Sequence, residues 1–388
     1  MDIKLSEDQN LLQDTAARFM QRECGFEFLR DIENNSNTGF CPHMWRSFAE
    51  MGWLGINLPE EYGGMGMTMV DNVILLRELG RKICPSPLLH TVVTAGESIS
   101  RCGTEVQKRE LLPSIVAGTS VYAFAFQELS RFFHPSHIRC EAKVEGDAYV
   151  ISGRKMFVEF ADRADTLLVV ARTGGPAINR KDSSGLTMFL VDRHSVGVTC
   201  ELMPTMSRDR QYEVVFDNVR VPESCILGNV DRAWADLEPA IQKTAIALCA
   251  YTNGAGFEMH ARATQYAKDR VQFDRPIGQM MTIQMYLAQS IMELYGADTL
   301  TLFTASNMDQ GLNVRGYVGK MKAFCAETVC RNMDTGSQIF GGMGYMEDHD
   351  TTLYLRRGKQ LELMLGGTEY WLEVIAEEII DRQPVNLS

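Results

Sequence analysis

The side chains that could do chemistry in this sequence do not gather into a standard catalytic motif. The ten cysteines form no CxxC pair, and the five-residue step from Cys325 to Cys330 does not suit a zinc knuckle. The seven histidines form no metal cluster, and His134 and His137 are their only close pair. We therefore expect mostly buried thiols and no metal site.

Three common cofactor and nucleophile motifs are missing from the sequence. Neither GxGxxG, nor GxxxxGK followed by Ser or Thr, nor GxSxG occurs. The sequence therefore supports neither a dinucleotide-binding fold, nor a P-loop, nor the nucleophile elbow of a hydrolase.

A glycine-rich segment is the most distinctive local feature. Gln338–Tyr345 reads QIFGGMGY and follows a long stretch of helical periodicity. One interpretation is a helix C-cap with a tight turn. The other is a close approach of the backbone to a ligand, which the lack of a Cβ atom permits. The segment alone leaves both open.

Length and composition are those of an ordinary globular protein. The chain has 388 residues, 45% of them hydrophobic, and a formal charge of −12, so we expect no nucleic-acid partner. No window approaches 18 uncharged apolar residues, so we expect no membrane span. The N-terminal MDIKLSEDQN is charged and amphipathic, which predicts no secretory signal and a cytoplasmic protein.

The periodicity of apolar residues changes twice along the chain. Up to about Gly118 they recur every three or four positions, as in helices, interrupted by a loop at Gly52–Gly66. Short apolar runs with turn signals between them then predict strands, at Tyr122–Phe126, Tyr149–Ser152, Thr166–Ala171, Thr187–Val191 and Val214–Phe216. Several short strands with almost no helix favour a small antiparallel barrel or sandwich.

Long helical patterns return after the strands. We expect helices from Trp234 to about Gln272, then near Thr282–Met308, Val314–Phe340 and Tyr370–Ile380. Short connections between long helices predict a bundle. The fold class is therefore α+β, with an N-terminal helical domain (1–119), a central antiparallel β-barrel or sandwich (120–230) and a C-terminal helical bundle (231–388).

Six motifs in a fixed order resemble the flavin-dependent acyl-CoA dehydrogenases over nearly the whole chain. They are Leu5–Gln9 (LSEDQ), Gly55–Gly66 (GINLPEEYGGMG), Gly153–Phe157 (GRKMF, like G-x-K-x-F/W), Glu213–Gly228 (EVVFDNVRVPESCILG), Arg270–Gly278 (RVQFDRPIG) and Gln338–Tyr345. The resemblance implies the same three-part fold, with a four-helix bundle at the C-terminus.

The resemblance implies an FAD-dependent oxidoreductase of lipid metabolism. In this family a carboxylate base removes the α-proton of an acyl-CoA thioester while the β-hydrogen leaves as hydride to the flavin. The aromatic ring of Phe157 corresponds to the one that packs on the flavin, and Arg270 and Phe273 to contacts with its diphosphate and adenine parts from a neighbouring subunit. The full set of implied cofactor residues is Gln127, Phe157, Glu159, Arg270, Phe273, Gln284, Gln338, Gly341, Gly342 and Thr368.

The catalytic base of the family is missing. It usually precedes Gly-Thr near the C-terminus, where this chain has Gly366 or Leu365, depending on the alignment. In some members the base stands on the long bundle helix instead, at the position of Thr244 here, and a supporting arginine is replaced by Ala245. None of these side chains can take up a proton, so the catalytic residue is unknown.

A second departure lies after the first strand. The family usually has T-E-P-x-x-G-S-D, whereas this chain has QELSRFFH from Gln127 to His134. Glu128 is retained, but Phe132 and Phe133 replace small residues. We expect this loop to be rebuilt and the usual path of CoA to be altered or blocked.

Four readings of the missing base stay open. In the first, the chain is the base-less subunit of a heteromer. Some family members pair a base-bearing subunit with a related base-less one, and the segment Glu347–Arg357 (EDHDTTLYLRR) resembles those base-less subunits. Alternatively, it is a homomer with a relocated base, or a homomer whose reaction, such as an elimination or a reduction, needs none. The last is a non-catalytic flavoprotein or scaffold. Candidates for a relocated base are Glu128, Glu159, Asp348 and Glu369.

The resemblance also implies partners. The flavin site of the family is shared between subunits, so we expect a homo- or hetero-oligomer, a dimer or a tetramer. The substrate would be an acyl-CoA, and an electron-transfer flavoprotein would reoxidise the flavin. The sequence does not identify the acyl group, because one methylene changes discrimination by only about 1–3 kcal/mol.

Overall fold

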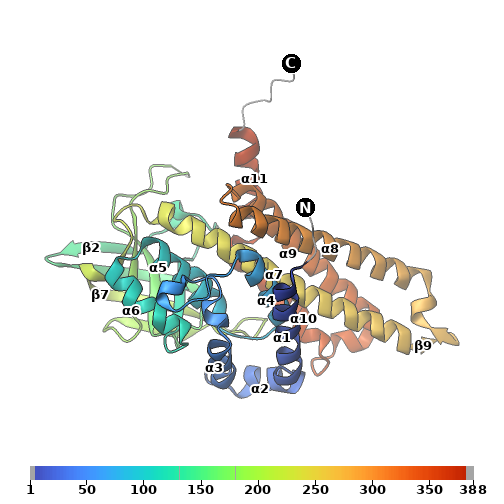
Figure 1. Ribbon diagram of the computed structural model, residues 1–388. Coiled ribbons are helices and arrows are strands. Elements are labelled where there is room, and N and C mark those ends of the chain that lie inside the picture. Colours follow the sequence, from blue (N-terminus) through green and yellow to red (C-terminus); the bar gives the residue numbers. More distant parts are fainter. Residues whose placement is uncertain (1–4, 131, 180, 382–388) are drawn as a thin grey trace. The chain divides into compact units, whose positions relative to one another are not determined.

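The chain forms two compact units, each built from separated stretches of sequence. The computed structural model describes residues 5–130, 132–179 and 181–381 (Figure 1). The bundle unit contains the described residues up to 29, 69–84 and those from 245 onward, and the sheet unit contains 30–68 and 85–244. Each unit therefore includes part of the N-terminal helical region. The boundaries at 119 and 230 stay a prediction.

An eight-stranded sheet forms most of the sheet unit, and every strand predicted from the sequence overlaps one of its strands, although the first prediction runs one residue past the end of β1, to Phe126. Neighbouring strands follow the order β6-β7-β3-β2-β4-β5-β8, and β1 pairs with β4 in parallel. The strands are β1 (Tyr122–Ala125), β2 (Glu141–Glu145), β3 (Ala148–Glu159), β4 (Thr166–Arg172), β5 (Leu186–Asp192), β6 (Val198–Leu202), β7 (Gln211–Pro222) and β8 (Ile226–Leu227).

The sheet does not close into a barrel, which corrects one of the two architectures expected from the sequence. In the described part of the chain the pairing runs in an open path whose ends are β6 and β8. The end strand β8 has only two residues and pairs only with β5. A strand this short offers few backbone groups for a further ladder.

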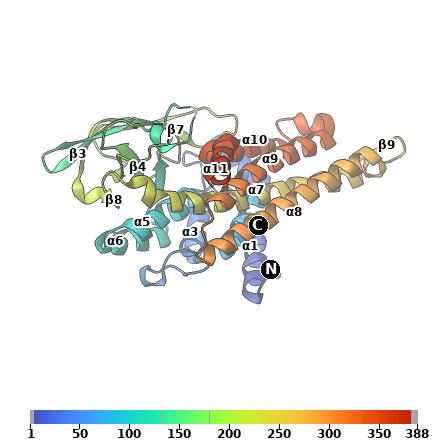
Figure 2. The same ribbon diagram turned by 90° about the horizontal axis from the view of Figure 1, so that it is seen from above.

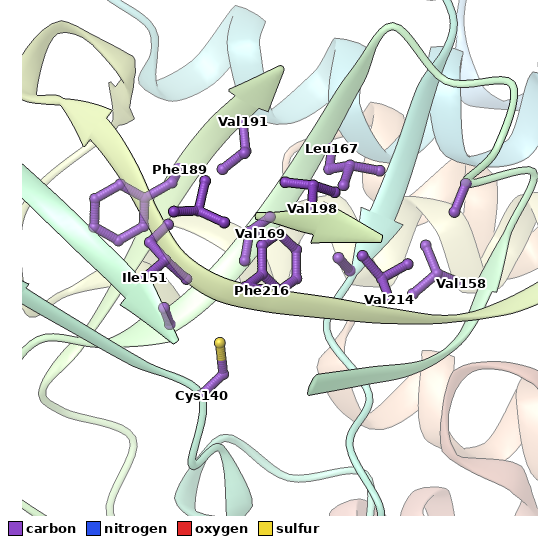
Figure 3. Packing of buried hydrophobic residues seen from close by; sticks show 14 of the residues in the cluster. Cys140, Ile151, Val158, Leu167, Val169, Phe189, Val191, Val198, Val214 and Phe216 are labelled. Carbon is purple, nitrogen blue, oxygen red and sulfur yellow. The ribbon is translucent and has the colours of Figure 1, made fainter. Parts of the chain in front are cut away.

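The apolar core of this unit comes from side chains on one face of the long strands. Figure 3 shows Ile151 of β3, Val169 of β4 and Phe216 of β7 among them, and all three are fully or almost fully buried. Successive side chains in a strand point to opposite faces, so alternating apolar residues gather on one side. This packing fixes β3, which carries Phe157 and Glu159.

Helices and tight turns complete the sheet unit. Trp45 in α3 donates its indole N–H to the carbonyl of Gly118 at 2.9 Å, which joins α3 to the residues just before β1. The predicted loop at Gly52–Gly66 contains two short 3₁₀ turns, and a Cβ atom on Gly64 would lie 2.1 Å from the carbonyl oxygen of Leu58. The helical elements of this region are α2 (Phe26–Asn35, of which 26–29 belong to the bundle unit), α3 (Pro42–Glu50), η1 (Trp53–Gly55), η2 (Glu60–Tyr62), η3 (Leu89–Gly96), α5 (Glu97–Cys102) and α6 (Glu105–Val116).

Long helices build the bundle unit, as the periodicity predicts. Helices α8 and α9 run side by side, and the short hairpin of β9 and β10 lies at one end of α8 in both views (Figure 1, Figure 2). The elements are α1 (Glu7–Glu23), α4 (Met69–Arg81), α7 (Ala233–Asp269, of which 233–244 belong to the sheet unit), β9 (Val271–Gln272), β10 (Arg275–Pro276), α8 (Met281–Asp309), α9 (Arg315–Phe340), η7 (Gly341–Tyr345), α10 (Thr351–Leu363), η8 (Met364–Gly366) and α11 (Gly367–Asp381). In the described part of the chain no helix is long and apolar enough to cross a membrane.

Polar contacts fix α4 inside this unit. The carboxylate of Asp309 accepts from the backbone N–H groups of Met69 and Val70 at 2.7 and 3.1 Å, which satisfies free donors at the start of α4. Further along α4, the Arg77 guanidinium lies 2.7 Å from the Asp298 carboxylate of α8, and both side chains are about 90% buried (10% and 11% exposed). Burial raises the pKa of Asp298, and Arg77 opposes that shift.

A buried lysine holds the end of α10. The Lys322 ammonium of α9 donates to the carbonyl oxygens of Leu361 and Glu362 at 3.3 and 3.0 Å. Burial lowers the pKa of Lys322 from its ordinary 10.5. These carbonyls belong to the last turn before the Leu365–Gly367 segment, so Lys322 supports the backbone at one of the family's base positions.

The buried lysine predicts a pH-dependent stability. Because the pKa is lower in the folded state, the unfolded chain binds more protons between that pKa and 10.5, and stability rises with pH in this window. We expect the wild-type unfolding free energy to rise relative to that of Lys322→Met as pH increases toward 10.5. Urea titrations of both proteins at several pH values measure this difference, and groups present in both cancel. A difference that does not change with pH would contradict the prediction.

Candidate functional site

The end of β3 presents an aromatic ring at the surface of the sheet unit. Phe157 has φ +56° and a side chain that is 51% exposed. A positive φ is costly for a bulky residue and marks a constrained position. The neighbouring Met156 donates its N–H to the carbonyl of Gln127 at 2.8 Å, so two predicted cofactor segments lie side by side. An exposed ring on a fixed strand suits the stacking of a planar cofactor.

Glu159, at the last position of β3, has a partner that the sequence did not reveal. Its carboxylate oxygen lies 3.2 Å from Nε2 of His90 in η3, and the two side chains are 12% and 10% exposed. No local pattern predicts this pairing, because the two residues belong to elements far apart in the sequence. The one hint in the sequence that Glu159 has a buried partner is its position between two apolar residues, Val158 and Phe160.

The retained carboxylate of Glu128 has a structural role. It accepts from the Lys155 ammonium at 2.7 Å and from the backbone N–H groups of Arg139 and Cys140 at 2.8 and 3.0 Å. Lys155 is completely buried and also donates to the carbonyl of Phe126. The carboxylate thus neutralises a buried cation and fixes the chain before β2, which argues against Glu128 as a relocated base.

The loop after β1 is rebuilt around aromatic packing. The ring of Phe133 lies 4.7 Å from that of Phe126, which in turn lies 5.8 Å from Trp234. The side-chain amide of Gln127 donates to the carbonyls of Glu128 and Ser130, so it shapes this loop. Arg131, in the middle of the loop, lies outside the described residues.

In the bundle unit, the segment Arg270–Gly278 forms a small hairpin after α7. Its ends are tied by two backbone bonds, from Arg270 to Tyr266 and from Ile277 to Arg270. Gln284 of α8 donates to the carbonyl of Gly278 at 2.9 Å. Phe273, at the tip, has φ +53° and is 85% exposed. The hairpin therefore offers an arginine and an aromatic ring at the surface, the chemistry that a diphosphate and an adenine would need.

The glycine segment lies at the same end of the bundle unit as this hairpin. Ile277 packs in one apolar cluster with Ile339 and Phe340, and Phe340 stacks on Tyr266 with ring centroids 4.4 Å apart. Gln338 precedes this cluster in α9. Gly341 has φ +61°, so it ends α9 as the first interpretation requires. A Cβ atom added at Gly341 or Gly342 meets nothing within 4 Å, so the backbone is also open to a ligand. Gln284, Gln338, Gly341 and Gly342 thus lie near Arg270 and Phe273.

Thr368 lies far from that end. It begins α11, which packs against the first half of α9, where Gly319 lies close to the carbonyl of Trp371. From Gly319 to Gly341 the helix rises about 30 Å at 1.5 Å per residue, and Thr368 is one turn from Trp371. Thr368 and Gly341 are therefore about 25 Å or more apart within one chain.

The two base positions hold residues that cannot act as bases. Leu365 is buried with φ +56°, and its carbonyl accepts from the indole of Trp371 at 2.9 Å. Gly366 follows with φ +97°. On α7, Thr244 is completely buried, donates to the carbonyl of Ala240 at 2.6 Å and lies 3.0 Å from the hydroxyl of Thr94.

The remaining candidates for a relocated base lie on the surface. Asp348 and Glu369 are exposed to solvent. Of the four candidates, Glu128 and Glu159 are largely buried, and each lies against a basic side chain, Lys155 and His90 respectively.

Each unit, taken by itself, carries side chains or backbone with the chemistry that parts of a flavin dinucleotide require. The hydroxyl of Thr368 is buried and has no hydrogen-bond partner within the described residues, so it has a donor to offer a phosphate. Phe157 supplies an exposed ring, and the open backbone at Gly341 and Gly342 admits close approach. Arg270 supplies a cation for phosphate oxygens.

Comparisons with known proteins identify the family of the chain. Residues 6–119, 123–219 and 234–380 match the N-terminal, middle and C-terminal domains of acyl-CoA dehydrogenase. The 3-(aryl)acrylate reductase of Clostridium sporogenes is 28% identical over 97% of this chain and 99% of its own. The probable acyl-CoA dehydrogenase YngJ of Bacillus subtilis is also 28% identical, over 98% of this chain and 100% of its own.

A solved structure extends the similarity to three dimensions. A variant of the Tcur3481-Tcur3483 steroid ACAD is 29% identical, with a TM-score of 0.85 over 96% of this chain and 98% of that chain. The three matched domains together cover most of the 388 residues and follow the order expected from the motifs. The chain belongs to the acyl-CoA dehydrogenase family, whose members are FAD-dependent oxidoreductases.

Proposed function

We propose that this chain is the base-less subunit of a heteromeric, FAD-dependent acyl-CoA dehydrogenase, in which a related subunit supplies the catalytic carboxylate. The observation that carries the proposal is the occupancy of the base positions by Leu365, Gly366 and the buried Thr244. The family's chemistry needs a carboxylate opposite the flavin, and these positions offer none.

The separation of the cofactor residues supports a site shared between subunits. Thr368 is about 25 Å or more from Gly341 within one chain. The Arg270 hairpin lies at the same end of the bundle unit as Gly341. A cofactor bound at Thr368 therefore does not reach Arg270 or Gly341 of the same chain. A second subunit would bring its own Arg270 end to the first subunit's Thr368. The implied contacts then form one site.

An exposed apolar stripe on α8 supports assembly through this end of the bundle unit. Met281, Met285, Met292 and Tyr295 are 61–74% exposed, and Ala288 between them is also exposed. Their spacing of four and three residues places them on one side of the helix, as in a coiled-coil seam. The stripe starts just after the Arg270 hairpin. In this proposal the stripe on α8 packs against a second subunit of the same fold, because such a subunit completes the flavin site.

The residues of this chain orient the cofactor and shield it. When bound, FAD accepts the β-hydrogen of the acyl-CoA as hydride. Phe157 offers its ring as a stacking surface, Arg270 balances diphosphate charge, and Thr368 donates a hydrogen bond. The partner's carboxylate takes the α-proton of the thioester, and an electron-transfer flavoprotein reoxidises the flavin.

Thr368→Val is expected to weaken FAD binding without destabilising the apoprotein. A hydrogen bond to a charged group contributes about 1.5–3 kcal/mol, which corresponds to roughly 10- to 100-fold in affinity. The apoprotein loses nothing comparable, because the buried hydroxyl has no partner in the described structure. Flavin release on dilution measures the affinity, and thermal unfolding measures the stability. Equal flavin retention in both proteins would remove Thr368 from the site.

The proposal is tested by purifying the chain alone and together with a base-bearing acyl-CoA dehydrogenase encoded beside it. We expect the co-expressed complex to be yellow and to bleach anaerobically with an acyl-CoA, while the chain alone is colourless or inert. A chain that bleaches alone would overturn the heteromer and indicate a base of its own. A chain that binds flavin neither alone nor with a partner would indicate a scaffold.

A reductive reaction is the second candidate, favoured by one comparison. The relative from Clostridium sporogenes is described as a 3-(aryl)acrylate reductase. A reductase would run the same hydride transfer in reverse. Oxidation of the dithionite-reduced complex by an α,β-unsaturated substrate, without bleaching by saturated acyl-CoAs, would favour this direction.

A further inference from the structure

We propose that His90 and Glu159 form a proton-uptake pair that balances the charge of the flavin when it is reduced. The inference rests on the proposed function in one respect, which is that the flavin binds against the Phe157 segment. The inference assigns a role to the imidazole of His90 and the carboxylate of Glu159, neither of which takes part in the transfer of the hydride or of the α-proton.

The pair is part of a buried chain of hydrogen bonds. Nε2 of His90 lies 3.2 Å from the Glu159 carboxylate, and Nδ1 lies 3.0 Å from the hydroxyl of Thr94. Thr94 in turn lies 3.0 Å from Thr244, whose hydroxyl donates to a helix carbonyl. The ring of Phe124 lies 5.8 Å from the imidazole. Both ring nitrogens therefore have partners, and the imidazole is held in one orientation.

Unusual backbone surrounds the pair on both sides. Phe157 and Phe160, which flank Glu159, have φ +56° and +54°. His90 and Thr94 belong to η3, a π-helix of eight residues. Strained residues and π-helical turns are both enriched at functional sites. Two such features from separate elements converge on one His–Glu contact, which favours a functional role over simple packing.

Three cationic side chains near the pair have other partners among the described residues. On α7, Lys243 lies 2.7 Å from Glu97 of α5. On β3 itself, Lys155 lies 2.7 Å from Glu128. On β7, Gln211 is the register partner of Glu159, and the guanidinium of the adjacent Arg210 donates to the carbonyl of Ser36. The imidazole of His90 lies against the Glu159 carboxylate, and histidine is the side chain that ordinarily changes charge near neutral pH.

Charge balance gives the pair its role. A flavin held against Phe157 would gain two electrons and one proton on hydride transfer, and thus one negative charge, on the strand that also carries the Glu159 carboxylate. Two negative charges in a site of low polarity repel each other strongly. Uptake of one solvent proton by His90 would restore the original net charge, and the imidazolium would remain in contact with the Glu159 carboxylate. The α-proton of the substrate goes to the partner's base, so this proton is an additional one.

The test counts protons on the flavin-loaded complex. We compare wild type, His90→Gln and Glu159→Gln, with His194→Gln as a control at an exposed histidine of the same unit. The midpoint potential is measured against pH with reference dyes. One additional proton per two electrons steepens the slope by about 30 mV per pH unit. We expect this extra slope in wild type and His194→Gln, and its loss in both His90→Gln and Glu159→Gln.

The outcomes separate this inference from the proposed function. Circular dichroism and flavin content first confirm that each variant is folded and loaded. A loaded His90→Gln protein with the wild-type slope would overturn the pair and leave the proposed function intact. If no preparation retains flavin, the proposed function fails and this inference fails with it. An unchanged slope in His194→Gln would exclude a general effect of removing any histidine.

Discussion

Gly366→Glu is expected to give the flavin-loaded complex acyl-CoA dehydrogenase activity that does not depend on the carboxylate of the partner. A positioned carboxylate base contributes about 10²- to 10⁴-fold in rate, so bleaching by a suitable acyl-CoA should accelerate by that factor. Gly366 has φ +97°, and a side chain there costs about 1–3 kcal/mol of backbone strain. Anaerobic stopped-flow absorbance at the flavin band measures the rate.

The matched control for this prediction is Gly366→Gln. Glutamine has the same size and the same backbone strain but cannot take up a proton. An equal rate for the glutamine and glutamate variants would show that the added side chain acts by a route other than proton removal. No acceleration in either variant would show that residue 366 does not face the substrate.

The other base position should respond in the opposite way. Thr244 is completely buried in α7, where its hydroxyl lies between Ala240 and Thr94. A glutamate there would place an unpaired carboxylate in the core and break the contact with Thr94. We expect Thr244→Glu to lose more than about 3 kcal/mol of stability and to gain no activity.

Glu128→Ala is expected to destabilise the protein by about 3–5 kcal/mol. The change leaves the completely buried ammonium of Lys155 without its carboxylate at 2.7 Å, and an uncompensated buried charge is costly. It also removes the acceptor for the backbone N–H groups of Arg139 and Cys140. Urea unfolding followed by circular dichroism gives the free energy.

A surface pair on the same sheet provides the control. Glu141 lies 2.8 Å from Lys143, but the two side chains are 56% and 76% exposed. Such pairs contribute about 0–1 kcal/mol, so Glu141→Ala should change little. The double variant Glu128→Ala with Lys155→Met should recover part of the lost stability, because it removes the stranded charge. Equal costs at residues 128 and 141 would refute the buried-pair account.

The sequence was most informative where periodicity is long. The helix expected from Trp234 to Gln272 runs from Ala233 to Asp269, and the one at Thr282–Met308 runs from Met281 to Asp309. Short strands were harder to find. β2 at Glu141–Glu145 was missed, because it is mostly exposed and has only one buried side chain. The barrel was wrong because closure depends on pairing between end strands, which a local pattern does not contain.

The candidate site divides in a similar way. Motifs located Phe157, Arg270 and the glycine segment, because each reflects a local backbone requirement. They did not reveal His90 or the burial of Lys155 against Glu128, which depend on contacts between distant elements. The roles of the implied cofactor residues stay predictions. The buried hydroxyl of Thr368, which has no hydrogen-bond partner among the described residues, allows its role to be tested by measuring flavin binding.

The interleaving of the two units has a consequence for synthesis. Helix α4 is almost wholly buried, and although α1 packs on it and precedes it in the chain, the rest of its unit begins at residue 245, about 160 residues after the previous segment of that unit ends at residue 84. At 5–20 residues per second, a ribosome needs roughly 8–30 s to make that stretch. During this time the apolar side chains of α4 lack their final neighbours, which makes the nascent chain a client for chaperones. Neither unit is a continuous segment, so a truncated gene ending before residue 245 would leave the same helix exposed permanently.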